Sequence, residues 1–108
     1  MLNEVTVVPL VTVVYEAKFP IGTVQVTPWA QSFLKSKGVS HLSYLVRHSL
    51  GDWGDITRAE QQQNELAVKA KQGFLYSSYV LDRSNDERLN ILTRWDRLVT
   101  TVSLPVEH

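Results

Sequence analysis

Polar and apolar residues alternate with a period of two in several stretches of the chain, which is the pattern of β-strands. One stretch lies near the start and is rich in β-branched residues, and three follow one another in the last third. We expect strands at residues 4–16, 21–26, 74–81, 88–95 and 98–104. A polar loop and then a tight turn at Asp96 and Arg97 join the last three, which therefore form a meander.

Three segments between these strands have apolar residues at helical spacing, each with a capping residue before it and a glycine after it. They lie at residues 28–37, 41–50 and 58–72. The third begins with the Thr57-x-x-Glu60 spacing of a capping box. The second carries an apolar stripe, which we expect to face the core, made of Leu42, Leu45, Val46 and Leu50.

Helices that precede consecutive hairpin strands predict an α+β fold, with the helices packed on one face of an antiparallel sheet that ends in a three-stranded meander. The 108 residues suffice for one modest core, so we expect a single domain over residues 1–108. Within it, residues 1–20 form an N-terminal strand extension and residues 21–108 form the α+β core.

The stretch at residues 4–16 has apolar side chains on both faces, and Pro9 makes it an edge strand or two short strands. Such a strand is stable only when it is covered, so we expect a homodimer that forms through it. It is too short to span a membrane, which takes about 20 residues. Glu4 stands where a signal peptide has positive charge. We therefore expect a cytoplasmic protein with no membrane partner.

Composition narrows the function classes further. The 11 Lys and Arg residues equal the 11 Asp and Glu residues, so no overall field attracts nucleic acid, and we do not expect a nucleic-acid partner. The chain has no cysteine, which excludes disulfides, zinc fingers and thiol catalysis. No phosphate-binding loop, dinucleotide fingerprint or His-Glu-x-x-His motif occurs, and we expect no cofactor and no metal.

Residues 47–55 crowd a histidine, a tryptophan, two acids and two glycines into a short segment. His48, Asp52 and Asp55 are candidates for an acid–base or metal site, because an imidazole beside carboxylates transfers protons or binds cations. The interpretation that we favour is structural, since a histidine ends helices well and aspartates form turns and caps. In either case a helix C-terminus and two acids should raise the pKa of His48 above about 6.5.

Two further groups of residues are candidates for ligand binding. Trp53 either plugs the core beneath its loop, which we favour, or exposes a ring for stacking. The meander carries a polar set that could line up across its strands and bind an anion through an arginine fork. We favour a solvated face with an ordinary ion pair for this set, which consists of Ser78, Asn90, Arg94, Asp96, Arg97, Thr100 and Thr101.

Several short motifs occur together between about residues 22 and 107: Val26-Thr27-Pro28, Arg47-His48-Ser49-Leu50-Gly51-Asp52-Trp53-Gly54-Asp55, Asn64-Glu65, Gly73, Ser77-Ser78-Tyr79, Thr93, Asp96-Arg97 and Thr100-Thr101-Val102-Ser103-Leu104-Pro105. As a set they resemble a family of small bacterial proteins that plasmids, integron cassettes and similar mobile elements carry. Residues 1–20 depart from that pattern. The resemblance implies a genomic setting and no established activity.

Two hypotheses of function follow. In the first, the chain is an accessory protein of a mobile element that acts as a binding or protein-interaction module, since no catalytic template is complete and the N-terminal strand offers an edge to a partner. In the second, it is a small enzyme with His48 as general base, Asp52 to orient it, and Arg94 or Arg97 to hold an anionic group. Convergence of these side chains in one pocket distinguishes the two.

Overall fold

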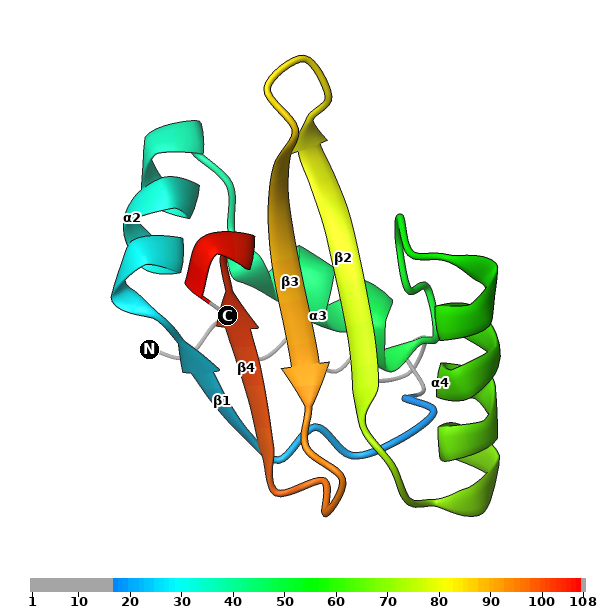
Figure 1. Ribbon diagram of the computed structural model, residues 1–108. Coiled ribbons are helices and arrows are strands. Elements are labelled where there is room, and N and C mark those ends of the chain that lie inside the picture. Colours follow the sequence, from blue (N-terminus) through cyan, green and yellow to red (C-terminus); the bar gives the residue numbers. More distant parts are fainter. Residues whose placement is uncertain (1–16, 108) are drawn as a thin grey trace, which may run out of the picture.

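The computed structural model describes residues 17–107, in which helices precede a run of strands (Figure 1). The expected strand at residues 4–16 lies outside this range. In chain order the elements are β1 (Thr23–Val26), α2 (Pro28–Lys37), α3 (His41–Ser49), α4 (Arg58–Ala70), β2 (Leu75–Asp82), β3 (Glu87–Thr93), β4 (Val99–Ser103) and the short 3-10 helix η2 (Pro105–Glu107). The α+β fold predicted from the sequence is confirmed. No helix among the described residues is long and apolar enough to cross a membrane.

The four strands form one open sheet in the order β1-β4-β3-β2 (Figure 1). Strands β2, β3 and β4 pair antiparallel, which confirms the meander. Strand β1 pairs parallel with β4, with Thr23 beside Val99 and Val26 beside Val102, so the sheet is mixed. Parallel partners need a long connection, and here the three helices and two strands between β1 and β4 provide it.

The helices begin where their capping residues predict. Thr27 accepts a hydrogen bond from the backbone N–H of Ala30, and Pro28 occupies the first turn of α2. At α4, Thr57 and Glu60 form both halves of the capping box. Helix α4 ends at Ala70, earlier than the predicted stop, and the left-handed residue that ends it is Lys71, with φ of 58°.

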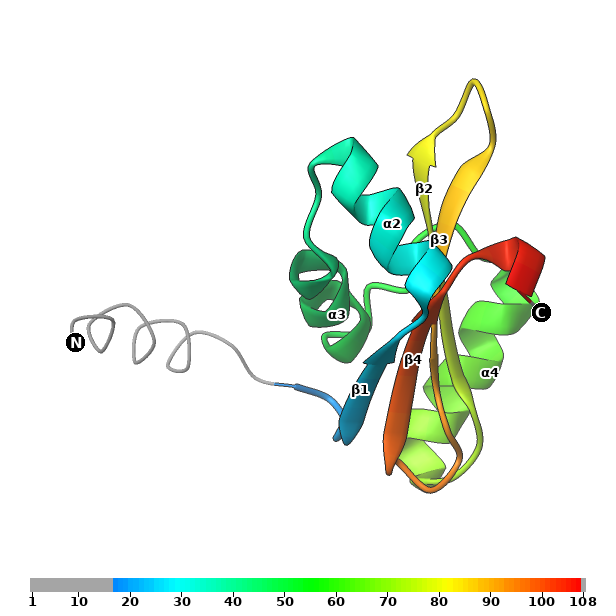
Figure 2. The same ribbon diagram turned by 90° about the vertical axis from the view of Figure 1, so that its left-hand side faces the viewer.

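Helices α2 and α3 lie on one side of the sheet (Figure 2). The prediction that the apolar stripe of α3 faces the core is wrong. Leu45 is buried, but Leu42, Val46 and Leu50 are exposed to solvent. The buried side of α3 carries His48 and Ser49 instead. The core between these helices and the sheet consists of Ala30, Leu34, Leu45, Tyr79, Leu89, Ile91 and Val102.

Helix α4 lies beside the outer edge of β2 (Figure 1). A second core cluster joins it to the sheet and consists of Phe19, Trp53, Ala67 and Leu75. Phe19 is buried in this cluster, and the backbone N–H of Lys18 donates to the carbonyl of Ser49. The packed core therefore begins before residue 21.

The outer edge of β2 is closed by hydrogen bonds from two segments. Asn64 of α4 accepts from the N–H of Tyr76 (3.0 Å) and donates to its carbonyl (2.7 Å). Two residues further along β2, the N–H of Ser78 donates to the carbonyl of Trp53 (3.1 Å). The carbonyl of Ser78 accepts from the N–H of Asp55. Edge strands that lack such partners recruit other chains, so this edge is unavailable for sheet extension.

Replacing Asn64 with alanine should remove both hydrogen bonds to Tyr76 and lower the free energy of unfolding by about 2 kcal/mol. Urea denaturation measures this change. Gln63→Ala is the matched control, because Gln63 lies on the exposed side of the same helix, and its midpoint should stay at the wild-type value. Equal midpoints for the two variants would show that water replaces the side chain of Asn64 at no cost.

Candidate functional site

His48 lies in the last turn of α3 and its side chain is fully buried, with 0% exposure. Each ring nitrogen has a hydroxyl partner on the sheet. Nδ1 lies 2.5 Å from Oγ of Ser77 on β2, and Nε2 lies 2.9 Å from Oγ1 of Thr93 on β3. The imidazole therefore joins the helix to two strands with both of its hydrogen-bonding positions filled.

The hydrogen-bond chain continues beyond His48 and fixes its tautomer. Thr100 donates its one hydroxyl proton to the carbonyl of Ile21 (2.6 Å), so its oxygen accepts from Thr93 (2.7 Å). Because the proton of Thr93 is used in that bond, its oxygen accepts from Nε2–H of His48. Nδ1 is then unprotonated and accepts from Ser77. A neutral imidazole satisfies every bond in this chain.

The surroundings of His48 are apolar. Phe19 meets the imidazole edge-on at 5.2 Å between ring centroids, and Trp53 does so at 5.6 Å. Burial lowers the pKa of His48 from its ordinary value of 6.5 to about 3. The prediction of a raised pKa is therefore wrong, because loss of water around the charged form outweighs any attraction to the helix end. His48 is neutral at physiological pH.

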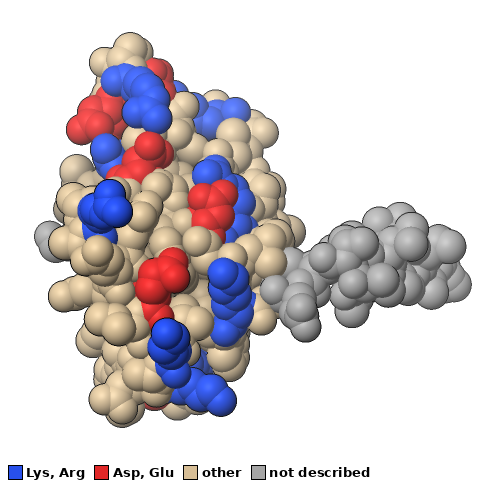
Figure 3. All heavy atoms as spheres, turned by 90° about the vertical axis from the view of Figure 1, so that its right-hand side faces the viewer, with Lys and Arg blue, Asp and Glu red and all other residues tan. Residues whose placement is uncertain are grey.

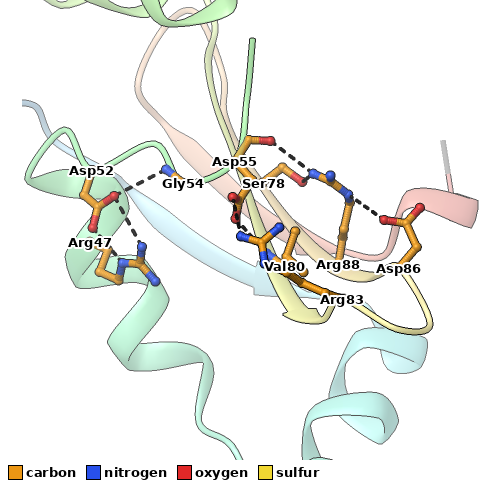
Figure 4. A network of polar contacts seen from close by, with 9 residues as sticks. All are labelled: Arg47, Asp52, Gly54, Asp55, Ser78, Val80, Arg83, Asp86 and Arg88. Carbon is orange, nitrogen blue, oxygen red and sulfur yellow. Dashed lines mark hydrogen bonds and ion pairs between the residues drawn. The ribbon is translucent and has the colours of Figure 1, made fainter.

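Asp52 does not reach His48. Its carboxylate accepts from Nε of Arg47 (2.7 Å) and from the N–H of Gly54 (3.3 Å), at the surface (Figure 4). The side-chain hydrogen bond from Arg47 lowers the pKa of Asp52. The arginine also lies over the ring of Tyr79, 4.6 Å from its centroid. This pair holds the end of α3 against the loop that follows it.

Asp55 lies at the outer edge of β2, where its partners are other than His48 (Figure 4). It accepts from the N–H of Val80 (3.2 Å) and from Arg83 (3.1 Å), and these bonds lower its pKa. Nη1 of Arg88 donates to the backbone carbonyl of Asp55 (3.1 Å). The three candidates of the acid–base hypothesis therefore diverge: the imidazole is internal, and each carboxylate pairs with its own arginine.

Trp53 plugs the core, as predicted. Its side chain is buried, its ring stacks on Phe19 at 5.9 Å between centroids, and its Nε1 donates to Glu65 of α4 (3.3 Å). The flanking Gly54 has φ of 76°, and a Cβ there would lie 2.4 Å from the carbonyl oxygen of Ser78. Only glycine lets the backbone that carries Trp53 approach β2 so closely.

The polar set of the meander separates into three places. Ser78 donates to Asn90 (2.8 Å), Thr100 belongs to the chain that begins at His48, and Arg94 pairs with Asp96 in the turn between β3 and β4. Arg97 donates to the backbone carbonyls of Ala67, Gly73, Arg94 and Trp95. Both arginines therefore have acceptors within the chain, and the side chains do not line up as one anion site.

Ser77 and Thr93 are the partners of His48 that sequence reasoning missed. A signal was present: Leu75, Ser77 and Tyr79 share one parity of β2, so Ser77 is a polar residue in a row of buried ones. Thr93 follows Ile91 in the same way on β3. Polar side chains at core-facing positions of neighbouring strands indicate a buried hydrogen-bonding partner, which α3 supplies as His48.

Within residues 17–107, no group of three or more His, Asp or Glu side chains gathers as a metal site requires. No protein family, curated protein or solved structure matches the chain. The segment at residues 47–55 is therefore interpreted from its geometry alone, which is that of a core plug with hydrogen bonds to β2.

The depressed pKa of His48 makes stability depend on pH. The unfolded chain takes up a proton near pH 6.5 and the folded chain does so only near pH 3, so the stabilising effect is complete above 6.5 and is lost as the pH falls. The free energy of unfolding should be about 2 kcal/mol lower at pH 5 than at pH 7. Urea titrations at both values measure this. In the His48→Gln variant, most of the difference in the free energy of unfolding between pH 5 and pH 7 should disappear. If the variant kept the wild-type difference, His48 would not be the cause of this pH dependence.

Trp53→Ala should lower the free energy of unfolding by about 3 to 5 kcal/mol, because it leaves a cavity between Phe19, His48 and α4. Trp53→Phe retains the ring stack with Phe19 and should cost clearly less. Chemical denaturation followed by circular dichroism compares the two. A Trp53→Ala midpoint within error of wild type would contradict the role of this ring as a plug.

Proposed function

We propose that the chain is a protein-interaction module that forms a homodimer through its N-terminal strand, and that it serves as an accessory protein of mobile elements. The genomic part of this proposal rests on the resemblance of its motifs alone. The interaction part is supported by one observation, the contrast between the two edges of the sheet. The edge at β2 is closed by Asn64 and by residues 53–55. Among the described residues, β1 pairs with β4 only and leaves its other side open.

The surface around β1 suits an apolar partner strand. Leu98, which precedes β4 beside the start of β1, is 61% exposed. Trp29, three residues after the end of β1, is 63% exposed. A strand with apolar side chains on both faces needs an edge for its backbone and apolar surface for its side chains. In a symmetric dimer each copy supplies residues 4–16 and the edge of β1 to the other.

A different arrangement is possible within one copy, and the experiment must distinguish it. The backbone N–H of Lys18 donates to the carbonyl of Ser49 at the end of α3, so the described chain begins beside that helix. Leu42, Val46 and Leu50 expose an apolar stripe along α3. If the N-terminal strand covered this stripe in its own copy, the protein would be a monomer whose residues 4–16 resist hydrogen exchange.

Light scattering coupled to gel filtration tests the proposal at tens of micromolar. The full chain should have the mass of a dimer, and deletion of residues 1–16, which spares Lys18 and Phe19, should give a monomer or an insoluble chain. Thr23→Lys/Gln25→Lys should weaken the dimer about tenfold or more, because each new ammonium group would lie beside the apolar side chains of the partner strand at the β1 edge. Gln61→Lys/Gln62→Lys on exposed α4 is the matched control and should dimerise as wild type does. A monomeric full chain contradicts the proposal.

A further inference from the structure

Two exposed aromatic rings flank a hollow at the end of the molecule where α4, the loop before β2 and the β3–β4 turn meet. Phe74 is 53% exposed and Trp95 is 57% exposed. The hollow has a volume of about 580 Å³, and its lining consists of Lys71, Gln72, Gly73, Phe74, Trp95, Asp96 and Arg97. Neither ring belongs to the described core clusters, so packing does not account for their presence.

Arg97 holds the two aromatic positions in place. Its guanidinium donates to the carbonyl of Gly73, next to Phe74, and to the carbonyl of Trp95 (3.2 Å). It also donates to the carbonyl of Ala67 near the end of α4 (3.1 Å). Its backbone adopts the left-handed conformation, with φ of 63°. These hydrogen bonds hold the backbone that lines the hollow in place, so a ligand would not have to order this backbone when it binds.

Lysines extend this hollow along α4. A second hollow of about 290 Å³ shares Lys71 and Arg97 with the first and reaches Lys18. A third, of about 260 Å³, shares Lys18 with the second and reaches Lys69. Lysine and arginine side chains gather toward the C-terminal end of α4, at the bottom of the view in Figure 3, with few acidic groups among them.

These lysines are available to a ligand. None of the ion pairs among residues 17–107 involves Lys18, Lys69 or Lys71. The two acids that line the hollows have partners of their own. Asp96 accepts from Arg94 and from the N–H of Leu98, and Glu65 accepts from Trp53. The surface is therefore locally positive although the whole chain has no net charge.

We propose that this aromatic and basic surface, made of Phe74, Trp95, Lys71, Lys69 and Lys18, binds single-stranded nucleic acid. Exposed rings stack unpaired bases of any sequence, and lysines along the same path bind the phosphates between them. A duplex does not suit it, because paired bases are already stacked and do not reach the rings. Sequence reasoning missed the surface because its lysines are scattered along the chain and only folding brings them together.

Fluorescence anisotropy of the full chain with labelled dT12 and U12 at low salt tests the proposal. Trp95→Ala should weaken binding about tenfold or more, since each stacked base contributes that much. Phe33→Ala is the matched control, because it removes a half-exposed aromatic ring of α2 that lies outside this surface, and it should bind as wild type does. Circular dichroism verifies that both variants fold. Quenching of tryptophan fluorescence by dT12 in Trp29→Phe, but not in Trp29→Phe/Trp95→Ala, gives a second measurement on the ring itself.

Salt dependence tests the lysines. Lys69→Gln/Lys71→Asn should reduce the slope of log K against log salt by about 1.4, and Lys35→Gln/Arg58→Gln, which removes the same charge elsewhere, should leave it unchanged. Asparagine is chosen at 71 because it tolerates the left-handed backbone there. Three results would overturn the proposal: no binding of either strand at tens of micromolar, duplex binding as tight as single-strand binding, or a deca-glutamate peptide that binds as well as dT12 and is insensitive to Trp95→Ala.

Discussion

The neutrality of His48 is the constraint on which much of this fold depends. An imidazole buried among Phe19 and Trp53 cannot hold a proton from water without great cost, so its two nitrogens must find one donor and one acceptor inside the protein. Ser77 and Thr93 provide them, and the hydroxyl of Thr93 in turn donates to Thr100. A shift of α3 by one residue, or a slip in strand register, would leave several of these groups unpaired. The chain of bonds thus specifies one arrangement of helix and sheet.

The segment that carries the unusual composition is explained by its position between α3 and α4. It must leave the end of a helix, place a large ring in the core and pair with the edge of β2 within a few residues. Trp53 fills the core and Gly54 permits the close approach to Ser78. Asp52 and Asp55 then satisfy backbone N–H groups and pair with arginines at the surface. A cluster of reactive residue types is therefore accounted for by geometry, each residue through a different contact.

Local patterns predicted the elements well, and tertiary contacts explain what they did not predict. Capping at Thr27 and Thr57 and the period-two strands depend on neighbours in sequence, so they were readable. The apolar stripe of α3 predicts a core-facing side, yet the helix buries His48, because Ser77 and Thr93 on the sheet form hydrogen bonds with its two ring nitrogens. The burial of Trp53 followed from its size alone. The pKa of His48 depends on its burial by side chains that include one distant in sequence, and patterns of neighbouring residues do not reveal such contacts.

The unequal edges of the sheet also limit how large an assembly can grow. If two copies met through β1, each would present its β2 edge to the outside, and Asn64 with residues 53–55 already occupies the hydrogen-bonding groups there. A third copy would find no strand to extend. Sheet pairing between copies of this chain would therefore end at a pair, and the loop that carries Trp53 would act as a stop against fibrous growth as well as a plug for the core.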